Sequence, residues 1–132
     1  MIGLDTNVLV RYIMQDDAGQ SPLANRLIES LSAAEPGFVP IVVIVELAWV
    51  LSAAYELSRA QLVEAFDGLL RTKELVVERA EIVWKALRGF QSTNTDFADC
   101  MIAESARASG CGRIMTFDRG AAKNGGMTLI VE

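Results

Sequence analysis

Four acidic residues of this chain fall where the sequence predicts a strand to end or a helix to begin. Asp5 follows the apolar residues 2–4, and Asp118 follows the run 114–117. Asp96 and Asp99 stand three residues apart at the mouth of a predicted helix, so they are neighbours on one helix face. Because ligands collect outside the carboxyl ends of parallel strands, we expect Asp5 and Asp118 to point into one crevice.

A fifth acid, Glu46, interrupts the longest apolar stretch of the chain. Five apolar residues precede it and five follow it, over residues 41–51. A helix in this setting is expected to offer the carboxylate little water. Acidic side chains are almost never fully buried unless they are paired. A salt bridge to a distant arginine is the alternative to a functional role.

Each acid also has a purely structural interpretation. Asp96 alone reads as a helix N-cap and Asp99 as an ordinary first-turn acid. Asp5 could form an Asx-type turn, and Asp118 could begin a turn or pair with Arg119. Taken together, however, these carboxylates match the oxygen ligands that Mg²⁺ or Mn²⁺ prefers. The chemistry that fits best is metal-dependent hydrolysis of a phosphodiester.

Composition excludes several other kinds of site. The chain has no histidine, which removes Ser-His-Asp hydrolysis, histidine zinc sites and His-His ribonuclease chemistry. Cys100 and Cys111 match no close zinc or redox spacing, and with no recognisable signal peptide we expect reduced thiols and a cytoplasmic location. The formal net charge of −5 has the wrong sign for holding nucleic acid by bulk electrostatics. A divalent cation in an acidic cleft would invert the local field and attract phosphate.

The predicted elements alternate between strands and helices along a single domain, residues 1–132. Strands are expected near residues 2–4, 38–39, 74–78, 113–117 and 127–131. Helices are expected from Ser21 as the N-cap with Pro22 at the first helical position, over 42–55, after a capping box at 58–61, over 80–90, and from Asp96 to about Ser109, where Gly110 closes the last. This alternation favours an α/β fold with a parallel sheet covered on both faces. No apolar stretch is long enough to span a bilayer.

The motifs resemble those of the PIN-domain ribonucleases, specifically the VapC-type toxins of type II toxin–antitoxin pairs. "LDTNVL" is similar to their opening motif, "VIVELAWVL" to the second, "TDFADCMIAESA" to the third and "IMTFD" to the fourth. The four motifs occur in order along nearly the whole chain. The resemblance implies a three-layer α/β/α sandwich around a central parallel sheet.

The resemblance also implies roles for individual residues. Asp5, Glu46, Asp99 and Asp118 would form the acidic quartet that binds Mg²⁺ or Mn²⁺, with Asp5 and Asp99 as direct ligands. Glu46 and Asp118 would complete the coordination or hold waters of a second ion. Three residues would be auxiliary: Asp96 as a reserve acid, and Asn7 and Thr116 as polar residues that order water or the carboxylates.

The family reaction implied is endonucleolytic RNA cleavage, in which a metal-activated water attacks phosphorus and leaves a 5′-phosphate and a 3′-hydroxyl. The resemblance implies a homodimer, and an antitoxin protein that inserts into the acidic cleft. The basic residues that are candidates for contacting RNA are Arg11, Lys85, Arg88, Arg119 and Lys123.

Two other functions remain open on the sequence. A phosphatase with a strand-end Asp nucleophile would need a second acid two residues after the first, where this chain has Asn7. A catalytically silent module of the same fold, binding a metal or a partner, would keep the acids without turnover.

Overall fold

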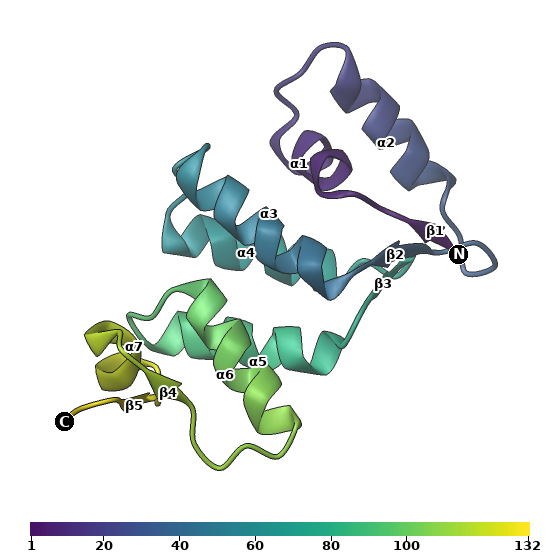
Figure 1. Cartoon of the computed structure of the whole chain (residues 1–132). Coiled ribbons are helices and arrows are strands. Elements are labelled where there is room, and N and C mark those ends of the chain that lie inside the picture. Colours follow the sequence, from purple (N-terminus) through teal and green to yellow (C-terminus); the bar gives the residue numbers. More distant parts are fainter. The chain divides into compact units, whose positions relative to one another are not determined.

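The computed structural model describes residues 1–132 and divides into two compact units, Met1–Ala80 and Glu81–Glu132. Figure 1 shows the chain coloured along its sequence, with the first unit in purple to teal and the second in green to yellow. Each unit is described by itself. None of the helices combines the length and the apolar character that crossing a bilayer requires.

The first unit is built on a three-stranded parallel sheet. Its strands are β1 (Ile2–Gly3), β2 (Gly37–Val39) and β3 (Leu75–Val77), in the order β1-β2-β3. Ile2 lies opposite Gly37, and Phe38 lies opposite Val76. The helices are α1 (Thr6–Met14), α2 (Gln20–Ser30), α3 (Ile41–Ala53) and α4 (Arg59–Leu70). Helix α1 packs against both α2 and α3, which brings the start of α1 to the side of α3.

Helix α3 begins without a cap from its own chain segment. Pro40 occupies the N-cap position and offers no side-chain acceptor. Glu78, just after β3, supplies one instead: its Oε1 accepts the Ile41 N–H at 2.8 Å. A carboxylate at this position also interacts favourably with the positive end of the helix. Glu78 therefore anchors the start of α3 to the end of the sheet, and Glu46 lies on this helix.

The second unit contains three helices and a parallel strand pair. Its elements are α5 (Ala80–Ser92, from the unit boundary), α6 (Phe97–Ala108), β4 (Met115–Thr116), α7 (Arg119–Asn124) and β5 (Thr128–Leu129). Phe90 and Phe97 make an edge-to-face ring contact with centroids 5.8 Å apart, which joins the end of α5 to the start of α6. A small apolar cluster packs α7 and β5 against α6 and comprises Ala103, Ala121, Met127 and Ile114.

Most predicted elements are present. The capping box at Ser58 and Gln61 is formed in both directions, and Gly110 has the left-handed conformation expected after α6, with φ +93°. The α/β class with parallel strand pairing is confirmed, and the pairs occur as one three-stranded and one two-stranded sheet. Helices α1 and α7 were not predicted.

The predicted N-cap at Ser21 is wrong. Helix α2 begins at Gln20, and the carboxylate of Asp17 accepts the Gly19 and Gln20 N–H groups at 2.9 and 2.7 Å. These backbone hydrogen bonds hold the pKa of Asp17 below its ordinary value. Ser21 is buried inside the first turn, where its hydroxyl donates to the Arg11 carbonyl at 2.9 Å. Ser21 therefore makes a tertiary contact and does not cap the helix.

Replacing Glu78 by alanine is expected to lower the free energy of unfolding by about 1 kcal/mol, because the start of α3 then loses its side-chain cap. Chemical denaturation of the two proteins measures this difference. Glu74→Ala is the matched control, since Glu74 precedes the same strand and its carboxylate makes no hydrogen bond or ion pair. Equal stabilities of the Glu78 and Glu74 variants would contradict the anchoring role.

Candidate functional site

Asp5 lies at the junction between β1 and α1, as expected for a strand-end acid. It is the N-cap of α1, and its Oδ1 accepts the Thr6 N–H at 2.7 Å. The residue is exposed, and its second carboxylate oxygen has no hydrogen-bond partner in the protein. The Oδ1 atom of Asp5 thus has the structural role of a turn or cap residue, and Oδ2 is available to a ligand.

Glu46 lies on α3 and is bonded to the start of α1. Its Oε1 accepts a hydrogen bond from the hydroxyl of Thr6. The expectation that the apolar stretch keeps water away from Glu46 is wrong, because Glu46 is exposed. Helix α3 is apolar on nearly all sides but buries only one face. Val42 and Trp49, on the same side as Glu46, are 71 % and 68 % exposed. No salt bridge to an arginine holds it.

Asp118 repeats in the second unit what Asp5 does in the first. It follows β4, caps α7, and accepts the Gly120 and Ala121 N–H groups at 2.8 and 3.1 Å through Oδ1. Its own N–H donates to the Thr116 hydroxyl oxygen at 3.0 Å, so Thr116 fixes the strand-to-helix turn. Asp118 forms no ion pair with Arg119. One carboxylate oxygen again remains without a protein partner.

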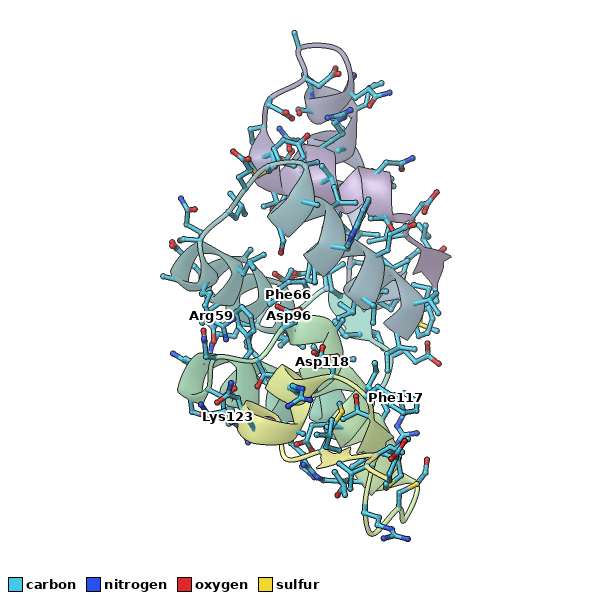
Figure 2. The ribbon with its side chains drawn as sticks, turned by 60° about the vertical axis from the view of Figure 1, so that its left-hand side comes forward. Arg59, Phe66, Asp96, Phe117, Asp118 and Lys123 are labelled. Carbon is cyan, nitrogen blue, oxygen red and sulfur yellow. The ribbon has the colours of Figure 1, made fainter.

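Asp96 and Asp99 lie in the first turn region of α6. Asp96 occupies the N-cap position, yet its side chain makes no capping hydrogen bond. Asp99 is partly buried and has no hydrogen-bond partner. Burial raises the pKa of Asp99 above its ordinary value, and the negative charges of Asp118 and then Asp96 raise it further. Figure 2 labels Asp96 and Asp118 within this unit.

The oxygen donors suit a hard divalent cation. Unit 1 holds Asp5 and Glu46 through Thr6, and unit 2 holds Asp99 within the electrostatic influence of Asp96 and Asp118. Within either unit, no three acidic or cysteine side chains lie close enough to enclose a metal ion by themselves. Burial and then repulsion by Asp118 and Asp96 raise the pKa of Asp99, and a bound cation would relieve this repulsion.

The auxiliary residues behave differently from one another. Asn7 is exposed on α1 and its side chain makes no hydrogen bond, so its predicted ordering of water or carboxylates stays a prediction. Thr6, which the sequence analysis treated only as a polar neighbour of Asp5, is 5 % exposed and is hydrogen-bonded to both candidate metal ligands of its unit, Asp5 and Glu46. The sequence analysis missed this role because it did not predict α1, of which Thr6 is the first residue.

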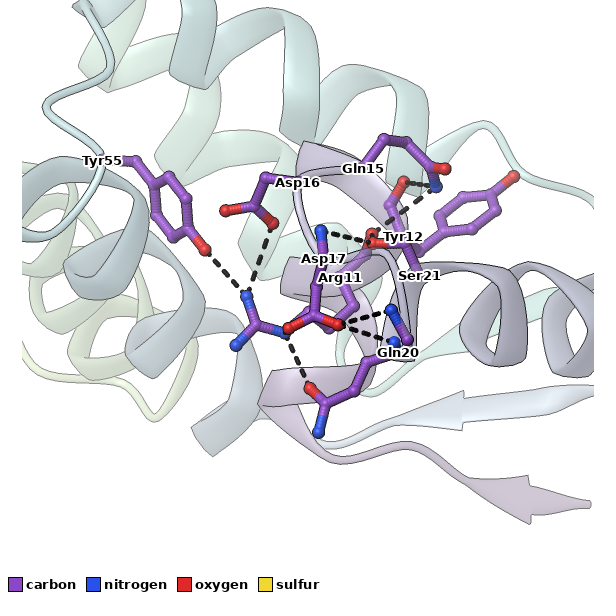
Figure 3. A network of polar contacts seen from close by, with 9 residues as sticks. Arg11, Tyr12, Gln15, Asp16, Asp17, Gln20, Ser21 and Tyr55 are labelled. Carbon is purple, nitrogen blue, oxygen red and sulfur yellow. Dashed lines mark hydrogen bonds and ion pairs between the residues drawn. The ribbon is translucent and has the colours of Figure 1, made fainter.

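Arg11 is fully engaged inside its own unit. Its guanidinium donates to Gln20 at 2.8 Å, to the Tyr55 hydroxyl at 3.1 Å and to Asp16 at 3.4 Å (Figure 3). This network ties the end of α1 to the start of α2 and to the segment after α3. The other four basic candidates are exposed and without ion pairs, two on α5 and two on α7: Lys85, Arg88, Arg119 and Lys123.

Comparison with known proteins decides the family. The model of the PIN domain family matches residues 2–126, which spans both units. The chain belongs to the PIN-domain family. The expected PIN-like α/β fold is thereby confirmed.

Two relatives are similar to this PIN-domain chain over nearly its full length. A VapC ribonuclease of Aquifex aeolicus (strain VF5) is 25 % identical over 126 residues, covering 96 % of this chain and 93 % of the relative. The crystal structure of Mycobacterium tuberculosis VapC20, a sarcin-ricin loop cleaving toxin, matches with a TM-score of 0.47 and 19 % identity. It covers 97 % of each chain. The family model and the similarity to the VapC ribonuclease confirm the predicted resemblance to VapC-type PIN-domain proteins.

The raised pKa of Asp99 predicts a pH dependence of the metal-free PIN domain. Between its ordinary and its raised pKa, the folded chain binds this proton more tightly than the unfolded chain. The stability that Asp99 contributes is therefore present at low pH and is lost as pH rises through the raised value.

Asp118→Asn is expected to lower the pKa of Asp99, and Asp96→Asn to lower it less, as followed by carboxyl ¹³C NMR titration.

Glu104→Gln is the control for that titration. Glu104 lies on the same helix but is paired with Arg107 at 2.7 Å and does not act on Asp99. The variant is expected to leave the pKa of Asp99 unchanged. Burial alone keeps the pKa of Asp99 above its ordinary value, so the test is the difference from the wild type. A pKa of Asp99 that is the same in the wild type and in both the Asp118 and the Asp96 variants would refute the proposed electrostatic coupling among these acids.

Proposed function

We propose that this chain is a Mg²⁺- or Mn²⁺-dependent endoribonuclease and the toxin component of a type II toxin–antitoxin pair. The single observation that carries the proposal is the set of carboxylates with unpartnered oxygens at the strand ends and helix starts of a PIN domain. The similarity to a VapC ribonuclease supports RNA as the substrate class. Because the chain has no histidine, its catalytic groups must be carboxylates, hydroxyls, lysines or a bound metal ion, and metal-dependent phosphodiester hydrolysis needs no others.

In this proposal Asp5, Glu46, Asp99 and Asp118 hold the metal, with Asp5 and Asp99 as direct ligands and Asp96 in reserve. The ion, when bound, would lower the pKa of water and neutralise charge on the phosphoryl oxygens. Asp5 and Asp118 each have one oxygen fixed by backbone N–H groups, so the other oxygen is held in a defined direction. The chain thereby orients its ligands before any ion arrives.

The binding partners in this proposal are an RNA substrate, a second copy of the chain and a cognate antitoxin protein, all in the cytoplasm. Lys85 and Arg88 lie one turn apart on α5, as do Arg119 and Lys123 on α7. Because these four cations are exposed and unpaired, they are available to phosphate groups. Arg11 is a weaker candidate, since its guanidinium already serves the network of its own unit.

Cleavage of a mixed pool of folded RNAs tests the proposal. Purified, antitoxin-free protein should cut RNA with Mg²⁺ or Mn²⁺ and not with EDTA. Asp5→Asn and Asp99→Asn should each reduce the rate about 100-fold or more, because even outer partners of metal ligands are worth about 10–100-fold. Gel electrophoresis of end-labelled RNA measures the rate.

Asp67→Asn is the matched control for the charge change. Asp67 is a surface acid of α4 whose carboxylate pairs with Arg71 at 3.0 Å, and its loss should leave the rate unchanged. Wild-type protein that binds Mn²⁺ but cuts no RNA would favour the catalytically silent module. Cleavage that survives EDTA and both substitutions would contradict the metal-dependent mechanism.

A further inference from the structure

Thr6 is hydrogen-bonded to both candidate metal ligands of the first unit, Asp5 and Glu46. Its backbone N–H donates to Asp5 Oδ1 at 2.7 Å, and its side-chain hydroxyl donates to Glu46 Oε1. The residue is the first of α1 and is almost completely buried, with 5 % exposure. Asp5 and Glu46 are 41 residues apart in the sequence, and Thr6 is the residue that joins them.

Glu46 has no other means of being held. Its carboxylate is exposed, and Thr6 is its only hydrogen-bond donor in the protein. The neighbours on the same side of α3 are Val42, Val45 and Trp49, of which the two valines cannot donate a hydrogen bond and none donates to Glu46. A glutamate side chain is flexible and loses considerable rotamer freedom when it is fixed. Without Thr6, the Glu46 carboxylate would sample many directions.

Thr6 is well suited to fix such an acceptor. Its β-branched side chain restricts rotation about χ1, and burial at the packed start of α1 restricts it further. A hydrogen bond to an ionised carboxylate is about twice as strong as one between neutral groups. The hydroxyl satisfies only Oε1, which leaves Oε2 of Glu46 available to another ligand.

We propose that Thr6 is a positioning residue that holds the Glu46 carboxylate in the direction needed for metal binding. This inference rests on the proposed function, because it assumes that Glu46 serves a divalent cation. The competing explanation is that the hydroxyl only ties α1 to α3, in which case its loss would affect stability alone. Metal affinity, measured apart from activity and stability, separates the two explanations.

Mn²⁺ binding by isothermal titration calorimetry is the direct test, with Thr6→Val, Thr6→Ser and Glu46→Ala variants of the full chain. Thr6→Val keeps the branched shape but removes the donor, and should weaken Mn²⁺ binding about 10-fold, as outer partners of metal ligands do. Thr6→Ser restores the hydroxyl and should bind within about 2-fold of the wild type. In the Glu46→Ala background, Thr6→Val should have no further effect on the Mn²⁺ affinity.

Thr72→Val is the matched control. Thr72 lies in the same unit, and its hydroxyl donates to the Gly68 carbonyl at 2.8 Å, so the substitution removes a comparable hydrogen bond elsewhere. It should leave Mn²⁺ affinity unchanged. Thermal unfolding of all variants confirms that each remains folded at the temperature of the titration.

The outcomes distinguish this inference from the proposed function. If the wild type and Thr6→Val bind Mn²⁺ equally while Asp5→Asn does not bind it, Thr6 has no positioning role and the metal site stands. An equal loss on Thr6→Val in the wild-type and Glu46→Ala backgrounds would also overturn the role, because the effect would not pass through Glu46. If the wild type binds no Mn²⁺, the proposed function fails and the inference fails with it.

Discussion

The structure depends on a carboxylate placed at the N-cap of a helix directly after a short parallel strand. Asp5 does this after β1 and Asp118 after β4. One oxygen of Asp5 accepts the Thr6 N–H, and one oxygen of Asp118 accepts the Gly120 and Ala121 N–H groups. The same bond ends the strand, starts the helix and fixes the carboxylate. A helix N-terminus stabilises the negative charge, so an acid is tolerated there without a cationic partner.

The remaining acids make fewer hydrogen bonds with the protein than Asp5 and Asp118 do. Asp96 stands at an N-cap without capping, and Asp99 is partly buried with no donor to satisfy it. Burial and two negative neighbours then raise the pKa of Asp99. Carboxylates kept close together at a cost in stability are characteristic of functional sites. Glu46 is instead held by a single hydroxyl, from Thr6.

The sequence predicted where the acids lie on strands and helices, but it did not predict what surrounds them. The strand-end positions of Asp5 and Asp118 and the helix-start positions of Asp96 and Asp99 follow from local signals such as apolar runs and caps, and the structure has them. The exposure of Glu46 did not follow, because α3 is apolar on all sides and periodicity cannot say which side packs. The role of Ser21 was predicted wrongly because Asp17 caps the start of the helix in its place, and the Ser21 hydroxyl donates to the Arg11 carbonyl on the preceding helix.

The chemical ends of the cleaved RNA test the central claim, hydrolysis by a carboxylate-held metal, most directly. Attack by water with departure of the 3′ oxygen predicts fragments with 5′-phosphate and 3′-hydroxyl ends, identified by mass spectrometry. Protein carrying Asp99→Asn, prepared identically, should form these fragments about 100-fold more slowly or not at all. Fragments with 5′-hydroxyl and 2′,3′-cyclic phosphate ends would show attack by the ribose hydroxyl, and would contradict the account.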